Sequence, residues 1–135
     1  MIKPLERRYE MPWNLDDSRP IWPQIKEKLM KDIVSGVYSP GESFPTVRDL
    51  AERACVNRNT MQRALSELES DGLVITNRTA GRTVTNDEEL LMNTRKNLAK
   101  AGVARILKEM EELGFSADEL IQLIISEKGD DSNEG

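Results

Sequence analysis

The chain has 135 residues, 38% of them hydrophobic, which is the size and composition of one compact domain, or of a small domain with an appendage. It contains no histidine, which excludes Ser-His-Asp and Cys-His catalytic relays and histidine-ligated metal sites within the chain. The formal net charge is −5, from 19 basic and 24 acidic side chains, and at face value it argues against a polyanionic partner.

Residues 1–18 show no hydrophobic period and predict an irregular N-terminal arm, with Trp13 or Leu15 as the residues that would dock it. A helix is expected to open at Pro20, because proline is tolerated in a first helical turn. Gly36 is the expected end of this helix, whose apolar residues recur every four positions: Ile21, Ile25, Leu29 and Ile33.

A second helix is expected to begin at Thr46 and a third at Asn57, since both residues are good N-caps. Two β-prone runs, residues 73–76 and 82–85, flank residues 77–81 and predict a small hairpin. The order helix, helix, turn, helix, hairpin predicts a mainly α fold with a small β-hairpin, a winged helix-turn-helix over residues 19–86.

Residues 87–128 predict two further helices, separated by Gly114 and with Ser116 as the second N-cap. Their apolar stripe has only a small winged helix to cover, so we expect it to be a dimerisation extension. The expected interface residues are Leu91, Leu98, Ile106, Met110, Leu113, Leu120 and Ile124. The polar residues 129–135 predict a disordered tail.

The third predicted helix begins with a run of polar residues, from Asn57 to Arg63. Arginine pairs bidentately with guanine, and asparagine or glutamine with adenine, in a major groove wide enough for a helix. Helix N-terminal amides and a threonine such as Thr60 can hold phosphates. Taken alone, however, this run is equally typical of a capped helix with a solvated face.

The surrounding arginines favour the DNA-binding interpretation. Arg48 lies near the start of the preceding helix, where a helix-turn-helix touches the DNA backbone, and Arg78 and Arg82 flank a hairpin tip containing Gly81. The distribution of charge agrees with DNA binding, because the predicted winged helix is the segment with a positive net charge. Residues 1–18 carry −1, residues 19–86 carry +2 and residues 87–135 carry −6. The acidity therefore belongs to the C-terminal third of the chain.

Catalytic and metal-binding interpretations find little support. Cys55 lies between an alanine and a valine and is expected to be a small core residue rather than a reactive thiol; as the one cysteine, it fits a reducing compartment. The carboxylates at 16–17, 87–89 and 130–131 are expected to be caps or solvated charges. No run is apolar enough to span a bilayer. The sequence thus predicts a cytoplasmic protein that is not an enzyme, with no cofactor, metal or membrane partner.

The run from Pro20 to Val84 resembles the DNA-binding domain of the GntR family of bacterial transcription regulators and covers about half of the chain. The matching phrases include residues 20–25, 35–36, 40–42, 45–51, 56–60, 63–65 with 68, and 72–73. Leu113-Gly114-Phe115-Ser116, which joins the two extension helices, is similar to the YtrA subfamily.

This resemblance implies a homodimer on double-stranded, palindromic operator DNA, usually acting as a repressor. The chain departs from the family at Gln62, where a basic residue is usual, and in its wing, where residues 79–84 replace Gly-x-Gly-Thr-Phe-Val. Residues and resemblance together predict these DNA contacts: Arg48, Asn57, Arg58, Asn59, Thr60, Gln62, Arg63, Arg78, Gly81 and Arg82.

Two questions remain open at the level of sequence. A protein-interaction module, in which the winged helix binds a protein partner, is the alternative to a DNA reader, and a salt titration separates the two. A small-molecule effector would have no dedicated domain and would need the dimer cavity or a crevice beside the extension. Trp13, Trp22 and Phe115 are the aromatic candidates for lining such a site.

Overall fold

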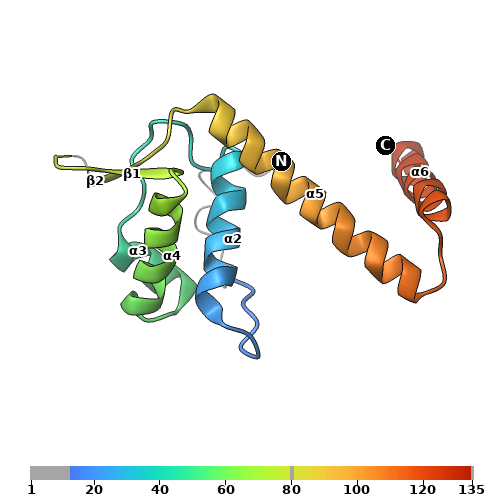
Figure 1. Cartoon of the computed structure of the whole chain (residues 1–135), viewed down its shortest axis with the longest axis horizontal. Coiled ribbons are helices and arrows are strands. Elements are labelled where there is room, and N and C mark those ends of the chain that lie inside the picture. The colour runs from blue at the N-terminus through green and yellow to red at the C-terminus, as the bar shows by residue number, and fades with distance from the viewer. Residues whose placement is uncertain (1–12, 80, 135) are drawn as a thin grey trace. The chain divides into compact units, whose positions relative to one another are not determined.

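The computed structural model describes the backbone of residues 13–79 and 81–134 and the side chains of 13–79 and 81–129. Figure 1 shows the elements in chain order: α2 (Ile21–Val34), α3 (Val47–Ala54), α4 (Arg58–Ser70), β1 (Val74–Asn77), β2 (Gly81–Val84), α5 (Glu88–Glu112) and α6 (Ala117–Glu134). The chain divides inside α5 into two compact units, one ending at Lys96 and one beginning at Asn97. The expected mainly helical fold with one hairpin is confirmed.

The core of the first unit lies among three helices, with α4 packed against both α2 and α3 (Figure 1). Each helix contributes the apolar face that its sequence period predicts. Tyr38 and Phe44, from the connection between α2 and α3, complete the core, with ring centroids 4.9 Å apart. The largest fully buried side chains on the helices are Ile25, Leu29, Leu50, Met61, Leu65 and Leu68.

Strands β1 and β2 form an antiparallel hairpin in which Val74 pairs with Val84 and Thr76 with Arg82. Residues 41–44 run along the other edge of β2 and are joined to it by three backbone hydrogen bonds of 2.8–2.9 Å. Gly41 has a φ of +79°, and a Cβ there would come within 2.9 Å of a side-chain oxygen of Asn86. The hairpin is therefore tied to the loop that leads into α3.

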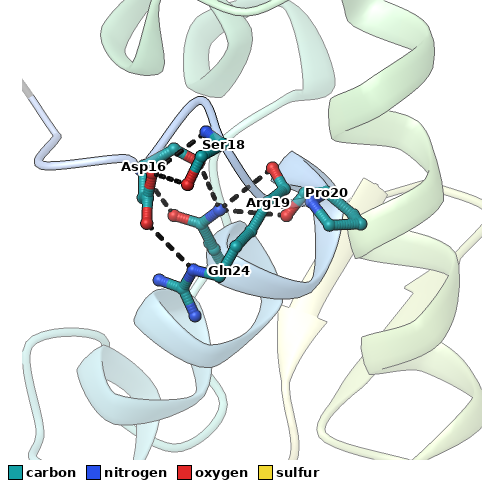
Figure 2. A network of polar contacts seen from close by, with 5 residues as sticks. All are labelled: Asp16, Ser18, Arg19, Pro20 and Gln24. Carbon is teal, nitrogen blue, oxygen red and sulfur yellow. Dashed lines mark hydrogen bonds and ion pairs between the residues drawn. The ribbon is translucent and has the colours of Figure 1, made fainter.

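Residues 13–18 form the irregular segment expected for the arm, while residues 1–12 lie outside the described residues. Trp13 is 8% exposed and belongs to the core, and Leu15 packs against it, which confirms the predicted docking. Gln24 of α2 closes the loop: its Oε1 accepts the Asp16 amide at 2.7 Å, and its Nε2 donates to the Asp16 carbonyl at 2.9 Å (Figure 2).

The first turn of α5 belongs to the winged helix rather than to the extension, which corrects the expected boundary at residue 87. Leu90 and Leu91 pack against the core of the first unit. Gly72, at φ +80°, makes room for Leu90, since a Cβ there would lie 3.3 Å from a methyl carbon of Leu90. Leu91, expected at a dimer interface, is thus in contact with its own domain.

The second unit contains the rest of α5 and helix α6. Ser116 and Glu119 form a reciprocal capping box at the start of α6, with bonds of 3.1 and 3.0 Å. The expected disordered tail is wrong for residues 129–134, because α6 runs to Glu134. A helix that is already nucleated gains one hydrogen bond for each residue added, which outweighs the weak helix propensity of a polar sequence. Among the described residues, no helix is long and apolar enough to span a membrane.

Candidate nucleic-acid interface

Helices α3 and α4 form the helix-turn-helix, and its geometry is fixed by local capping. The Thr46 hydroxyl accepts the Asp49 amide at 3.1 Å, and the Asn57 side-chain oxygen accepts the Thr60 amide at 2.8 Å. Between the helices, Cys55 adopts a left-handed conformation with φ 57°. Both predicted N-caps are confirmed, and they define where each helix begins.

The first two turns of α4 present polar side chains to solvent on the face opposite the core. Arg58, Asn59 and Gln62 are exposed, whereas Met61 is fully buried. The Gln62 amide donates to the Ser66 hydroxyl at 3.0 Å, one turn further along the same face. An exposed helix face of this composition has the donors and acceptors that read base edges in a major groove.

A groove lies where the N-termini of α3 and α4 meet the hairpin. Three predicted DNA-contacting arginines line it together, although they come from separate elements: Arg48, Arg58 and Arg82. The remaining lining residues are Phe44, Pro45, Thr46, Val47, Thr76 and Gly81. Three guanidinium groups around one open groove form a site suited to phosphate oxygens.

The three arginines differ in their partners within the protein. Arg48 is paired with Glu52 at 3.4 Å in an exposed i,i+4 ion pair. Arg82 forms a half-buried ion pair with Glu69, at the C-terminal end of α4. Arg58 is exposed and forms no ion pair with any described residue. The whole Arg58 guanidinium group can thus donate to an outside acceptor, whereas Arg48 and Arg82 each share theirs with a carboxylate.

The other predicted contact residues lie around this groove rather than in it. Asn57 and Thr60 line a separate pocket with Trp13 and Cys55, at the N-terminus of α4. Arg63 is stacked on the Trp22 ring of α2. Arg78 is exposed at the hairpin tip.

Two polar residues of this region escaped the sequence reasoning, Glu69 and Thr76. The Thr76 hydroxyl donates to Glu69 at 2.9 Å, and Arg82 donates to the same carboxylate oxygen. Burial raises the pKa of Glu69, but the hydrogen bonds from Arg82 and Thr76 and the charge of Arg82 outweigh it, so the pKa lies below its ordinary value. A predicted register for the hairpin would have placed Thr76 opposite Arg82. No sequence signal indicates that Glu69 of α4 lies beside them.

Cys55 is exposed, which corrects the expectation of a small core residue. The chain needs a left-handed residue here to leave α3 and enter α4 within three positions, and that conformation turns the side chain away from the core. Its thiol donates weakly to the Glu52 carbonyl, with a sulfur–oxygen distance of 3.7 Å.

The described residues contain no group of three or more Cys, Asp or Glu side chains that could hold a metal ion. Of the aromatic residues considered for an effector site, Trp13 is already packed in the core, with Lys28 5.0 Å above its ring. Trp22 is covered by Arg63, and Phe115 is 38% exposed. The two tryptophans therefore serve the protein's own packing.

Comparison with known proteins agrees with this geometry. Residues 23–84 match the family model described as bacterial regulatory proteins, gntR family. The chain is 32% identical over 105 residues to an uncharacterised HTH-type transcriptional regulator, YhcF, of Bacillus subtilis, covering 78% of this chain and 87% of that protein. It is 28% identical to the HTH-type transcriptional repressor YtrA of the same organism, covering 79% and 83%.

A solved structure of a GntR family transcriptional regulator from Listeria monocytogenes is similar over nearly its whole length. The two share 33% sequence identity with a TM-score of 0.76, covering 83% of this chain and 98% of that one. Sequence, fold and the arginine-lined groove point the same way. The chain belongs to the gntR family of bacterial regulatory proteins and is a sequence-specific DNA-binding transcription regulator.

Proposed function

We propose that this regulator is a repressor that binds a palindromic operator as a homodimer, in the cytoplasm and without catalysing a reaction. The observation that carries the proposal is the groove in which Arg48, Arg58 and Arg82 meet beside the exposed turns of α4. Repression is supported by the name of the YtrA relative. A net charge of −5 implies weak non-specific attraction to DNA, so affinity depends on these few placed arginines.

The proposed roles follow the exposure of each side chain. Arg58, Asn59 and Gln62 read base edges, because they are exposed polar residues on the first turns of α4 and, unlike Arg63, are not stacked on α2. Gly81 lets the hairpin approach DNA closely, while Asn57 and Arg63 flank the reading face. The proposed phosphate contacts are Arg48, Thr60, Arg78 and Arg82.

The homodimer is supported by the apolar surface of the second unit. Leu113 is 67% exposed and Ile124 is 55% exposed, so the described residues leave both largely uncovered. An open groove between α5 and α6 is lined mainly by apolar residues: Ile106, Met110, Leu120, Leu123, Ile124, Glu127 and Lys128. Apolar surface of this extent is typical of a protein–protein interface.

A pair of substitutions on α6 tests the homodimer. Ile124→Asp places a charge in the apolar groove and should convert the dimer to a monomer in light scattering at micromolar concentration. Gln122→Asp adds the same charge at an exposed site on the opposite side of the helix and should leave the dimer intact. A wild-type chain that is monomeric at these concentrations would refute the proposal.

Selection of bound DNA from a random pool tests the operator. The expected product is a palindrome with half-sites about one helical turn or more apart. Arg58→Ala should weaken binding by roughly 1–3 kcal/mol and relax the preference at one position of each half-site. Equal weakening on all sequences would instead make Arg58 a phosphate contact.

A salt titration separates DNA binding from the alternative of a protein-interaction module. Several phosphate contacts require the logarithm of the affinity to fall steeply with the logarithm of the salt concentration. A flat dependence would contradict the proposed interface and favour a protein partner.

A further inference from the structure

The Glu69 side chain is hydrogen-bonded to both strands of the hairpin, at two residues that pair with each other. It lies in the last turn of α4, and one of its carboxylate oxygens accepts hydrogen bonds from the Thr76 hydroxyl and the Arg82 Nε. Thr76 and Arg82 are direct partners in the β1–β2 register. A single side chain at the end of α4, the recognition helix, is therefore bonded to both strands of the β1–β2 hairpin, the wing.

This contact differs from the other ion pair at the groove. The side chains of Arg82 and Glu69 are 20% and 31% exposed, whereas those of Arg48 and Glu52 are 70% and 67% exposed. Ion pairs at exposed sites contribute little, because water and salt screen them, whereas half-buried charge-assisted hydrogen bonds hold their geometry. The Glu69 contact can thus fix a conformation, and the Glu52 contact cannot.

The position of Arg82 connects this contact to the groove. Its Nε is the atom bonded to Glu69, and the residue also lines the groove with Arg48 and Arg58. A guanidinium group has two further nitrogens beyond Nε, which remain as donors to an outside acceptor. Its backbone is held as well, since the Phe44 amide donates to the Arg82 carbonyl at 2.8 Å.

We propose that Glu69 is a positioning residue for operator binding: it fixes the wing on the recognition helix and holds the Arg82 guanidinium ready for a phosphate. Binding then requires little further ordering of a long side chain, which otherwise costs affinity. The inference rests on the proposed phosphate contact of Arg82. The opposite role, in which Glu69 competes with DNA for Arg82, is an outcome of the test.

The test measures operator affinity for Glu69→Gln with Glu52→Gln as the matched control. Both substitutions remove one negative charge beside a groove arginine, so any gain in DNA affinity from the loss of that charge appears in both variants. Glu69→Gln should bind about three- to tenfold more weakly than Glu52→Gln, the range expected when one side chain must be ordered on binding. Equal or tighter binding by Glu69→Gln would overturn the proposal.

A double-mutant cycle shows whether Glu69 acts through Arg82. In an Arg82→Gln background, Glu69→Gln should cause no further loss, whereas additive losses would mean that it only destabilises the fold. Arg82→Gln should also lower the salt dependence by about one phosphate contact, and an unchanged affinity and slope would overturn the inference. Failure of the wild-type chain to bind any selected DNA would refute the proposed function itself.

Thr76→Val provides a second variant that leaves both charges in place. It removes one of the two hydrogen bonds to Glu69 and should weaken operator binding in the same direction as Glu69→Gln, by a smaller factor. Melting temperatures of all variants, measured without DNA, verify that each is folded at the assay temperature. A Thr76→Val variant that is folded and binds as tightly as wild type would contradict the proposal that Glu69 must be bonded to both strands.

Discussion

The guanidinium carbon of Arg63 lies 4.5 Å from the centroid of the Trp22 ring, so that a side chain of the recognition helix is stacked on α2. Arg63 follows Arg58 by five positions, which rotates it about 140° around α4. That rotation points Arg63 toward α2, while Arg58 lines the groove. One helix therefore uses two arginines in different ways, and their sequence context does not distinguish them.

Arg63→Gln should lower the free energy of unfolding by about 0.5–1 kcal/mol, because it removes a cation from the face of an indole ring. In a Trp22→Leu background the same substitution should have a smaller effect. Urea unfolding of the four proteins in this cycle measures the coupling, with Arg78→Gln at the exposed hairpin tip as the control. Operator affinity should fall less for Arg63→Gln than for Arg58→Gln, and the reverse order would show that Arg63 is the stronger DNA contact.

Asn57 allows capping and DNA binding to be separated. Its side-chain oxygen caps α4 through the Thr60 amide, so Asn57→Ala should lower the free energy of unfolding by about 1 kcal/mol. Asn57→Asp keeps the cap and adds a favourable charge at the helix N-terminus, so stability should be retained. The same carboxylate would face DNA phosphates and should weaken operator binding. Titrations of both variants with operator DNA test whether Asn57 lies at the interface. An Asn57→Asp variant that binds as tightly as wild type would place Asn57 outside it.

The parts of the fold that depend on neighbouring residues could be predicted from the sequence. Thr46 and Asn57 cap amides three positions ahead, and Gly36 takes the positive φ, +89°, expected where α2 ends. Each of these features involves a few consecutive residues, so the rules of local geometry are sufficient.

The parts that depend on distant residues could not be predicted in this way. Glu69 and Arg82 are thirteen positions apart, and their contact requires the relative placement of α4 and the hairpin. Leu91 fits a helical stripe equally well whether it contacts its own domain or a second subunit. Tyr38 and Phe44 enter the core from a loop, where no hydrophobic period exists to identify them.

Cys55 occupies a position that glycine would fill with less strain. Its φ of 57° places a side-chain carbon in the left-handed region, which costs non-glycine residues about 1–2 kcal/mol. Glycine loses more backbone entropy on folding, so Cys55→Gly should raise the free energy of unfolding by a net amount of about 0.5–1 kcal/mol. Cys55→Ala keeps the strain, lacks the thiol and should not stabilise the protein. Chemical unfolding compares the three proteins, and a glycine variant less stable than the alanine variant would contradict the argument.

Low pH should weaken the contacts of Glu69 with Arg82 and Thr76 of the wing. The folded protein holds the pKa of Glu69 below its ordinary value of 4.5, because hydrogen bonds from Arg82 and Thr76 outweigh the burial that raises it. Between the two pKa values the unfolded chain binds more protons at this site than the folded chain. The stabilisation is therefore fully present above about pH 4.5 and is lost as the pH falls through the lower, folded pKa.

Urea unfolding of wild type and Glu69→Gln at pH 7 and at pH 3 measures this effect. Wild type should be the more stable protein at pH 7, and the difference should shrink at pH 3, since a protonated carboxyl resembles the amide. Asp16 supplies a control: hydrogen bonds from the hydroxyl and amide of Ser18 and from Arg19 also lower its pKa (Figure 2). Asp16→Asn should change the acid dependence without altering the difference between wild type and Glu69→Gln. A difference of equal size at both pH values would mean that the charge of Glu69 does not contribute to holding the wing.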